Sequence, residues 1–230
     1  IDLGTVGAGA LAGIHDIIGE DTLPVGVIRS FRGETGYYSG LLVAADSPYR
    51  TLEDLKGKRI GYINLNSTSG YIYPRAAMRK EGIEPDTFFG ESGVSGGGVP
   101  GMIGLSSGQF DGIFFFTSFD TNEEALATGY MRILEERDML KSKDYRFIWF
   151  AGPIPSSSLV MRGDKNPGFQ DLMIGVANSL PYEAPELLMS LGLTNRGSSF
   201  ESVSLGFFEE IIEMRRAEIE GTSGTQGDAQ

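Results

Sequence analysis

Three consecutive hydroxyl residues stand where an apolar strand gives way to a predicted helix. Ser67, Thr68 and Ser69 follow the strand-like run Arg59 to Ile63 and precede a helical pattern with Pro74 in its first turn. The first N–H groups of a helix lack intrahelical acceptors, and the helix dipole places about half a positive charge there. Such a helix start binds anions, and hydroxyl groups add donors without adding charge. One hydroxyl suffices to cap a helix, so helix capping and ligand binding both stay open.

A glycine-rich stretch forms a second candidate anion site. The chain contains 33 glycines, and they concentrate between Gly90 and Gly112. Backbone N–H groups of Gly97 and Gly98 can converge on an anion in a nest-like turn. A glycine loop that binds nothing is the alternative interpretation, and the residues alone do not decide between the two.

The same stretch matches the five-residue elbow of serine hydrolases, in the order Gly93-Val94-Ser95-Gly96-Gly97. In those enzymes the histidine follows the nucleophile along the chain, whereas the only histidine here, His15, precedes Ser95. His15 lies among isoleucines in an Ala/Gly-rich helical pattern, which is typical of a packed or surface histidine. We therefore predict that the chain is not an enzyme.

Composition limits the partners that the chain can bind. The net charge of -12 and the pI near 4.6 argue against nucleic acid, which proteins bind with Lys and Arg. Neutral donors in a closed cleft can still hold an anion, because distant surface charge is screened beyond about 8 to 10 Å. With no cysteine and a single histidine, the chain is expected to hold neither a metal ion nor a cofactor.

Apolar runs alternate with helical patterns along the chain, which predicts an α/β protein. Strands are expected at Ile1 to Leu3, Val25 to Phe31, Tyr38 to Ala44, Arg59 to Ile63, Gly112 to Phe116, Phe147 to Phe150 and Leu159 to Arg162. Helices are expected at Thr51 to Leu55, Tyr71 to Glu81, Val99 to Gln109, Asn122 to Arg137, Gly168 to Leu180, Ala184 to Leu191 and Ser204 to Glu220. The tail from Gly221 to Gln230 is expected to be disordered.

Two strand segments, around Leu41 to Asp46 and Phe150 to Ser157, bracket a self-contained βαβα unit. We interpret them as crossing points between two lobes. Lobe 1 is then formed by residues 1–46 and 152–230, and lobe 2 by residues 47–151.

Several segments together resemble the phosphonate-binding proteins of ABC transporters. The main resemblance lies in Asp54-Leu55-Lys56-Gly57-Lys58-Arg59 followed by Asn66-Ser67-Thr68-Ser69-Gly70-Tyr71-Ile72-Tyr73-Pro74. Gly36-Tyr37-Tyr38-Ser39, Gly108-Gln109-Phe110-Asp111-Gly112 and Pro153-Ile154-Pro155-Ser156 fall in the same order as in the family, so the resemblance covers about Ile1 to Asn178.

The resemblance implies a periplasmic-binding-protein fold, in which two α/β lobes joined by two crossing strands close on a ligand. Ser67, Thr68 and Ser69 would then hold the oxygens of a phosphonate, phosphite or phosphate. Tyr37 would line the cleft and offer its phenolic O–H, although a strand tyrosine that is simply packed is the alternative. The family's ligand-side histidine falls at about Gly98 here, so that side-chain donor is absent.

The substituent on the ligand is a further expectation from the resemblance. Family members that bind aminoalkyl phosphonates hold the ammonium group with acidic residues, and those positions fall near Ser118 and Ser157. Neither residue is acidic, and Asp120 is close in sequence only. We therefore expect a preference for phosphite, methylphosphonate or phosphate over aminoethylphosphonate.

Location and partners also follow from the resemblance. It implies a periplasmic or extracytoplasmic protein, with a membrane anchor before residue 1 left open, that acts as a monomer with an ABC permease. The longest apolar stretch, Gly112 to Thr117, is far shorter than the roughly 20 residues of a membrane span. Family members carry a further strand-helix-strand unit before the region matching Ile1 to Gly7, so the first lobe is expected to be incomplete at its N-terminus.

Two alternatives keep the fold and change the role. One is an oxyanion-sensing domain that feeds a signalling kinase, and the other is a binding protein for a sulfonate or arsenite. The amino-acid sequence does not choose among them.

Overall fold

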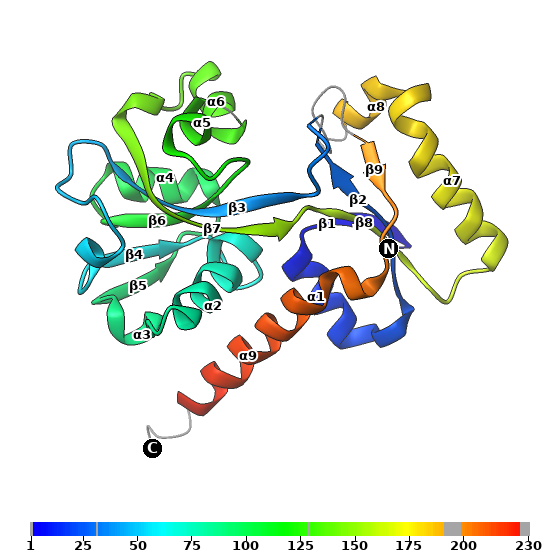
Figure 1. The fold of residues 1–230 in the computed structure, drawn as a ribbon, viewed down its shortest axis with the longest axis horizontal. Coiled ribbons are helices and arrows are strands. Elements are labelled where there is room, and N and C mark those ends of the chain that lie inside the picture. The colour runs from blue at the N-terminus through cyan, green and yellow to red at the C-terminus, as the bar shows by residue number, and fades with distance from the viewer. Residues whose placement is uncertain (1, 31, 128, 191–198, 226–230) are drawn as a thin grey trace. The chain divides into compact units, whose positions relative to one another are not determined.

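The chain forms two compact units in the computed structural model, which describes residues 2–30, 32–127, 129–190 and 199–225 (Figure 1). The first unit comprises Ile1–Gly36 and Pro155–Gln230, and the second comprises Tyr37–Ile154. The boundaries expected from sequence lie after residues 46 and 151. The observed boundaries differ from these because the second unit contains nearly all residues of strands β3 (Gly36–Ala44) and β7 (Tyr145–Pro155).

An antiparallel sheet with the strand order β1-β8-β2-β9 is the centre of the first unit. Its strands are β1 (Leu3–Val6), β2 (Thr22–Arg29), β8 (Ser158–Arg162) and β9 (Ser199–Glu201). The helices of this unit are α1 (Ala8–Ile18), α7 (Pro167–Glu183), α8 (Pro185–Ser190) and α9 (Glu209–Thr225), with 3-10 turns at Gly19–Asp21 and Leu205–Phe208. Val25 and Met161 of the sheet pack against Ala177 of α7.

Helices α1 and α9 pack against each other although they come from opposite ends of the chain (Figure 1). Small and aliphatic side chains at Ala8, Leu11 and Ala12 are fully buried on α1. Arg215 and Arg216 of α9 both bond to the Asp16 carboxylate, at 3.0 and 2.9 Å. Partly exposed ion pairs contribute about 1 kcal/mol or less each, so the burial of apolar side chains stabilises this contact more than the ion pairs do.

A mixed five-stranded sheet with the order β5-β4-β6-β3-β7 is the centre of the second unit. The remaining strands are β4 (Arg59–Tyr62), β5 (Glu91–Val94) and β6 (Gly112–Thr117). The helices are α2 (Tyr73–Lys80), α3 (Pro85–Phe88), α4 (Gly98–Ser106), α5 (Asn122–Ala127) and α6 (Gly129–Glu136), with short turns at Glu53–Leu55 and Ser142–Asp144 and a π-helical turn at Thr68–Ile72. Strand β4 runs parallel to β5 and β6, whereas β3 runs antiparallel to β6.

The aromatic run in β6 shows how the two faces of this sheet are covered. Successive strand side chains point to opposite faces, so Phe114 packs in one apolar cluster while Ile113 and Phe115 pack in the other. Met102 of α4 covers the second face, and Met78 of α2 covers the first. Phe114 and Phe115 are therefore core, whereas Phe116, near the end of the strand, is 39% exposed.

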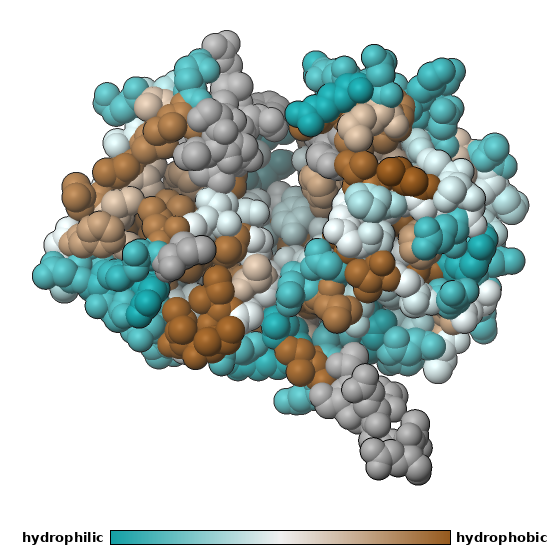
Figure 2. All heavy atoms as spheres, turned by 180° about the vertical axis from the view of Figure 1, so that it is seen from behind, coloured by the Kyte–Doolittle hydropathy of each residue, from teal (hydrophilic) through white to brown (hydrophobic). Residues whose placement is uncertain are grey.

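The surface is polar but interrupted by apolar areas, which Figure 2 shows in brown. Large exposed apolar side chains on the first unit include Ile17, Phe169 and Leu172. Scattered apolar exposure of this kind is usual in folded proteins. Within the described part of the chain, no helix combines the length and the apolar character that crossing a membrane requires.

Differences between the expected and observed elements arise where apolar patterning is weak. Strand β5 has the sequence Glu-Ser-Gly-Val and is held by its pairing with β4, so periodicity does not reveal it. The first strand is Leu3–Val6 and not Ile1 to Leu3, and only a 3-10 turn forms within Thr51 to Leu55. The tail expected to be disordered is helical as far as Thr225. Positions 226–230 and the end of the helix expected at Ala184 to Leu191 lie outside the described residues.

Candidate functional site

Four of the predicted site segments meet at one edge of the second unit's sheet. The carboxyl ends of parallel strands lie at the same edge, and Ser67 to Ser69 follow β4, Gly97 and Gly98 follow β5, and Ser118 follows β6. Strand β3 enters at this edge, because it is antiparallel to β6 and pairs Tyr38 with Thr117. Tyr37 therefore lies at the same edge. Ligands of α/β sheets bind at such carboxyl edges.

The segment Ser67 to Gly70, here called the serine turn, closes a π-helical turn after β4. The Ile72 N–H donates to the Ser67 carbonyl at 3.0 Å, which is an i to i+5 bond. The Ser67 hydroxyl accepts the Gly70 N–H at 3.1 Å, so Ser67 does cap the turn. A hydroxyl that accepts one hydrogen bond still has its own hydrogen to donate, so the capping role leaves Ser67 able to contact an anion.

Gly70 packs the serine turn tightly against the end of β4. A Cβ at position 70 would stand 2.4 Å from Cγ1 of Ile63 and 2.8 Å from the Ser67 hydroxyl. The Ile63 N–H in turn donates to the Gly70 carbonyl at 3.1 Å. The close approach requires glycine, and it fixes the place of the turn.

Tyr37, Thr68 and Ser69 form one cluster of hydroxyl groups. The side chains of Ser69 and Thr68 lie close enough to the Tyr37 phenol to influence its pKa. Thr68 and Ser69 are only 4% and 6% exposed. Burial raises the pKa of the Tyr37 phenol, and the side chains of Ser69 and Thr68 oppose that rise without cancelling it. Tyr37 therefore stays protonated at neutral pH and keeps an O–H that can donate to an anion.

The segment Ser95 to Gly98, here called the glycine turn, is fixed to β4 from the other side. The Ser95 hydroxyl lies 3.0 Å from both the Tyr62 and the Gly97 carbonyl oxygens. Gly96 has a φ of 82°, a left-handed conformation that favours glycine. Gly97 is the N-cap residue of α4 and makes no side-chain bond to the first amides of the helix, which lack intrahelical acceptors in any helix.

The two remaining predicted site residues lie in different units. Ser118 is half-buried after β6, where Thr117 closes a turn by accepting the Phe119 N–H at 3.2 Å. Ser157 belongs to the first unit, and its carbonyl accepts the Ile28 N–H at 2.9 Å. The edge of the second unit thus gathers every predicted site residue except Ser157.

Sequence reasoning gave no role to Ser39. This residue of β3 is completely buried, and its hydroxyl donates to the Ser69 carbonyl at 2.7 Å. It stands two positions after Tyr37 on the same strand, and alternate strand residues share a face. The sequence Gly36-Tyr37-Tyr38-Ser39 does contain the alternate spacing of Tyr37 and Ser39. The role of Ser39 follows only from the position of the serine turn, which the sequence does not give.

A buried cation lies near the serine turn, and its charge is already paired. Arg75 of α2 is 2% exposed and donates to both oxygens of Asp86, at 2.8 and 2.7 Å. Its guanidinium also lies 5.0 Å from the centre of the Tyr71 ring. The hydrogen bond from Arg75 is the main cause that lowers the pKa of Asp86. Arg75 therefore anchors the helix that follows the turn.

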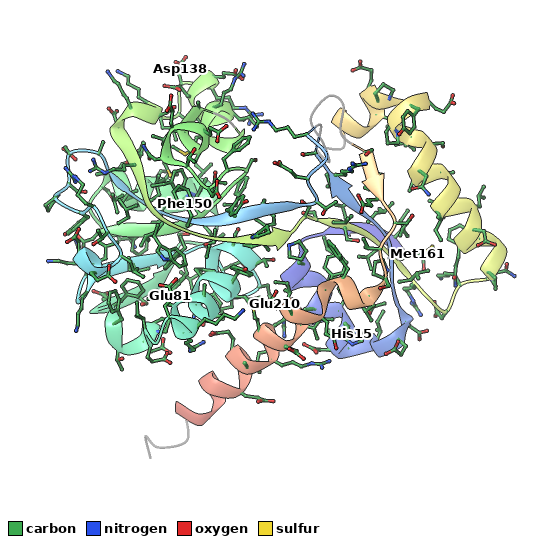
Figure 3. The ribbon with its side chains drawn as sticks, viewed as in Figure 1. His15, Glu81, Asp138, Phe150, Met161 and Glu210 are labelled. Carbon is green, nitrogen blue, oxygen red and sulfur yellow. The ribbon has the colours of Figure 1, made fainter. Side chains whose placement is uncertain are left out.

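The residues of the hydrolase-like elbow have other partners. His15 lies on α1 of the first unit, with Nδ1 2.9 Å from the Gly19 carbonyl oxygen (Figure 3). The Ser95 hydroxyl donates to backbone carbonyls in the second unit. Among the residues that the structure describes, no group of three or more His, Cys, Asp or Glu side chains is arranged to hold a metal ion.

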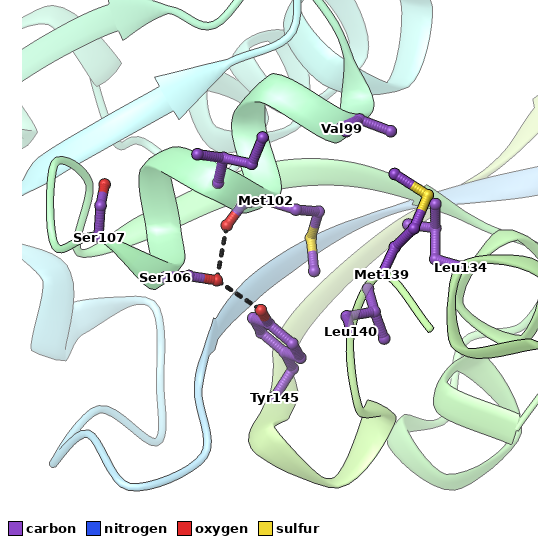
Figure 4. Close-up of a pocket in the computed structure, with 9 residues that line it drawn as sticks. Val99, Met102, Ser106, Ser107, Leu134, Met139, Leu140 and Tyr145 are labelled. Carbon is purple, nitrogen blue, oxygen red and sulfur yellow. Dashed lines mark hydrogen bonds between the residues drawn. The ribbon is translucent and has the colours of Figure 1, made fainter. Parts of the chain in front are cut away.

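A separate cavity of about 500 Å³ lies along α4 (Figure 4). Its lining is mainly apolar and includes Met102, Leu134 and Met139. The hydroxyls of Ser106 and Tyr145 lie 2.6 Å apart and bond each other. The Ser106 hydroxyl also lies 2.9 Å from the Met102 carbonyl oxygen, to which it can donate. Both hydroxyl hydrogens thus have acceptors within the protein, so the cavity offers an oxyanion much less than the carboxyl edge does.

Comparison with known families gives an extended match. The model of one family covers residues 1–197, and that family is described as the phosphonate ABC transporter periplasmic substrate-binding protein. The phosphate-import protein PhnD of Mycolicibacterium smegmatis is 30% identical over 156 residues, which are 61% of this chain and 47% of that protein. The chain thus spans about half the length of this curated relative.

Solved structures share the fold. PhnD1 from Prochlorococcus marinus, in complex with methylphosphonate, aligns with a TM-score of 0.71 at 17% identity, over 94% of this chain and 78% of that one. XAC2383 from Xanthomonas citri, bound to chloride, aligns with a TM-score of 0.72 at 16% identity, over 96% and 79% of the two chains. A binding component of an ABC phosphonate transporter from Pseudomonas aeruginosa aligns at 0.69 and 21% identity, over 87% and 64%.

These likenesses confirm the predicted fold class, an α/β periplasmic-binding-protein fold. The family model covers the whole of the second unit and, in the first unit, the elements from β1 to α8. The chain therefore belongs to the family of periplasmic substrate-binding proteins of phosphonate ABC transporters.

Proposed function

We propose that this chain captures a small tetrahedral phosphorus oxyanion, a phosphonate, phosphite or phosphate, for import by an ABC transporter. The observation that carries the proposal is the cluster of Tyr37, Thr68 and Ser69 hydroxyls at the carboxyl edge of the sheet. Three neutral donors from two chain segments converge there. A single cap of a helix needs only one of them.

The binding free energy expected of such a site suits a protein that captures a solute. Hydrogen bonds to charged groups contribute roughly 1.5 to 3 kcal/mol each. The hydroxyls of the serine turn and the amides of the glycine turn together supply enough donors for micromolar binding, which corresponds to about 8 kcal/mol. Neutral donors also explain how a chain with a net charge of -12 holds an anion.

Small substituents on the phosphorus fit this proposal best. By the resemblance to the family, Ser118 and Ser157 fall near the positions whose acidic residues pair with a ligand ammonium in aminoalkylphosphonate binders, and both are neutral here. Methylphosphonate, phosphite and phosphate therefore bind more tightly than aminoethylphosphonate. The names of two similar proteins, one for phosphate import and one in complex with methylphosphonate, support this ligand class.

As a transport component the chain does no bond chemistry. Ligand binding shifts the two units toward a closed arrangement that a membrane permease recognises. The chain acts as a monomer outside the cytoplasm, and family membership supports this location and a transporter partner.

A thermal-shift screen tests the proposal directly. A ligand that binds only the folded state stabilises it, by about 2.7 kcal/mol at a concentration of 100 Kd. Phosphate, phosphite, methylphosphonate, aminoethylphosphonate, sulfate, a short alkanesulfonate and arsenite are compared at equal concentration. We expect the first three to raise the melting temperature most. A larger shift with sulfonate or arsenite, or no shift with any phosphorus oxyanion, overturns the proposal.

A further inference from the structure

One carbonyl of the serine turn, that of Ser69, cannot accept the hydrogen bond that the π-helical pattern would give it. The Ser67 carbonyl accepts the Ile72 N–H, and the Thr68 carbonyl accepts the Tyr73 N–H, each five residues on. The next bond in this series would run from residue 74 to the Ser69 carbonyl. Residue 74 is Pro74, and proline has no N–H to donate.

A side chain from a different strand supplies the missing donor. The Ser39 hydroxyl donates to the Ser69 carbonyl oxygen at 2.7 Å. Ser39 is 0% exposed and Ser69 is 6% exposed, so water has little access to this bond. A buried carbonyl without a partner is strongly disfavoured, so the hydroxyl decides how the Ser69 peptide is oriented.

Strand β3 contacts residue 69 twice. Tyr37 and Ser39 are two positions apart on β3 and share one of its faces. The Ser39 hydroxyl donates to the Ser69 carbonyl at 2.7 Å, and the Tyr37 phenol lies beside the Ser69 hydroxyl. The same strand thus lies against the side chain of Ser69 and holds its backbone.

We infer that Ser39 is a positioning residue for oxyanion binding, replacing the N–H that Pro74 lacks and holding the serine turn in its binding conformation. The inference rests on the proposed function of this turn. Ser39 itself does not touch the ligand. Ser39 keeps the serine turn ordered before the ligand binds. Less conformational entropy is then lost on binding, which is how preorganised sites gain affinity.

Calorimetric titration of the whole chain with methylphosphonate and with inorganic phosphate tests the inference. Ser39→Ala is expected to weaken binding of either anion about tenfold, as for a lost buried hydrogen bond. Ser47→Ala is the matched control, because Ser47 also donates to a backbone carbonyl at 2.7 Å, beyond the other end of β3. This control is expected to bind within about twofold of the original chain.

Rescue at the same carbonyl separates positioning from simple packing. Pro74→Ala restores a backbone N–H at residue 74, which can donate to the Ser69 carbonyl in place of Ser39. The double variant with Ser39→Ala and Pro74→Ala is expected to recover most of the lost affinity, while Pro74→Ala alone leaves affinity unchanged. A role of Ser39 in packing alone would not respond to a new N–H.

The possible results distinguish a failure of this inference from a failure of the proposed function. The inference is overturned if Ser39→Ala binds like Ser47→Ala, or if adding Pro74→Ala recovers no affinity. Should Ser39→Ala not fold, the double variant carries the test and must fold and bind. An original chain that binds neither anion overturns the proposed function, and this inference with it, whereas an original chain that binds while Ser39→Ala is unaffected overturns this inference only.

Discussion

The serine turn and the glycine turn leave neighbouring parallel strands at the same edge, but they are fixed in different ways. The serine turn offers side-chain hydroxyls and is closely packed, with Thr68 and Ser69 buried and no space for a Cβ at Gly70. The glycine turn offers backbone amides and is open, because a Cβ at Gly96 would meet nothing within 4 Å. The comparison suggests that the first turn determines affinity and that the second adapts to the ligand.

Removing the hydroxyls of the serine turn is the strongest test of this contrast. Thr68→Ala combined with Ser69→Ala deletes two donors, and at roughly 1.5 to 3 kcal/mol each we expect affinity for methylphosphonate to fall at least a hundredfold. Calorimetry gives the affinity, and circular dichroism reports the fold. Ser107→Ala, which removes a hydroxyl at the far end of α4, serves as the control. Unchanged affinity in the double variant would place the site elsewhere.

Tyr37→Phe removes one donor and keeps the ring. We expect affinity for methylphosphonate to fall about tenfold to a hundredfold, because one hydrogen bond to a charged ligand is lost. Tyr49→Phe is a suitable control, since the Tyr49 hydroxyl faces Asp111 at 3.5 Å and not the serine turn. If both variants bind equally well, Tyr37 is packed and does not contact the ligand.

Adding a methyl group to each turn compares their packing. Gly70→Ala forces a contact of 2.4 Å with Ile63, and overpacking of this kind costs about 1 to 3 kcal/mol of unfolding free energy. Gly97→Ala meets Pro100 at 3.4 Å in an extended conformation, so we expect a cost within about 0.5 kcal/mol. Urea unfolding measures both. Equal costs would contradict the contrast between a packed and an open turn.

The pH dependence of binding is expected to be the smallest effect. Burial raises the pKa of Tyr37 above its usual value near 10, so the phenol keeps its proton through that pH. Methylphosphonate affinity should therefore stay level from pH 8 to about 10 and fall only at higher pH, where a phenolate would repel the anion. A decline that begins well below pH 10 and is absent from Tyr37→Phe would show the opposite shift.

The sequence predicted the fold class and the serine turn because both depend on local patterns. Alternating apolar runs indicated the α/β class, and three hydroxyl residues before Pro74 indicated the helix start. Strand β5 escaped detection because its stability comes from pairing with β4 and not from its own residues. Ser39 escaped for a related reason: its partner carbonyl is thirty residues away, and no local spacing encodes that contact.

The makeup of the hydroxyl cluster has a consequence for the conditions in which it works. Sites built from Lys or Arg lose affinity as ionic strength rises, because dissolved ions compete for their charge. Tyr37, Thr68 and Ser69 bear no formal charge at neutral pH, and the last two are buried. Anion binding by such a cluster, as proposed above, would depend on the shape and hydrogen bonding of the anion, and its affinity would change little between low and high salt concentration.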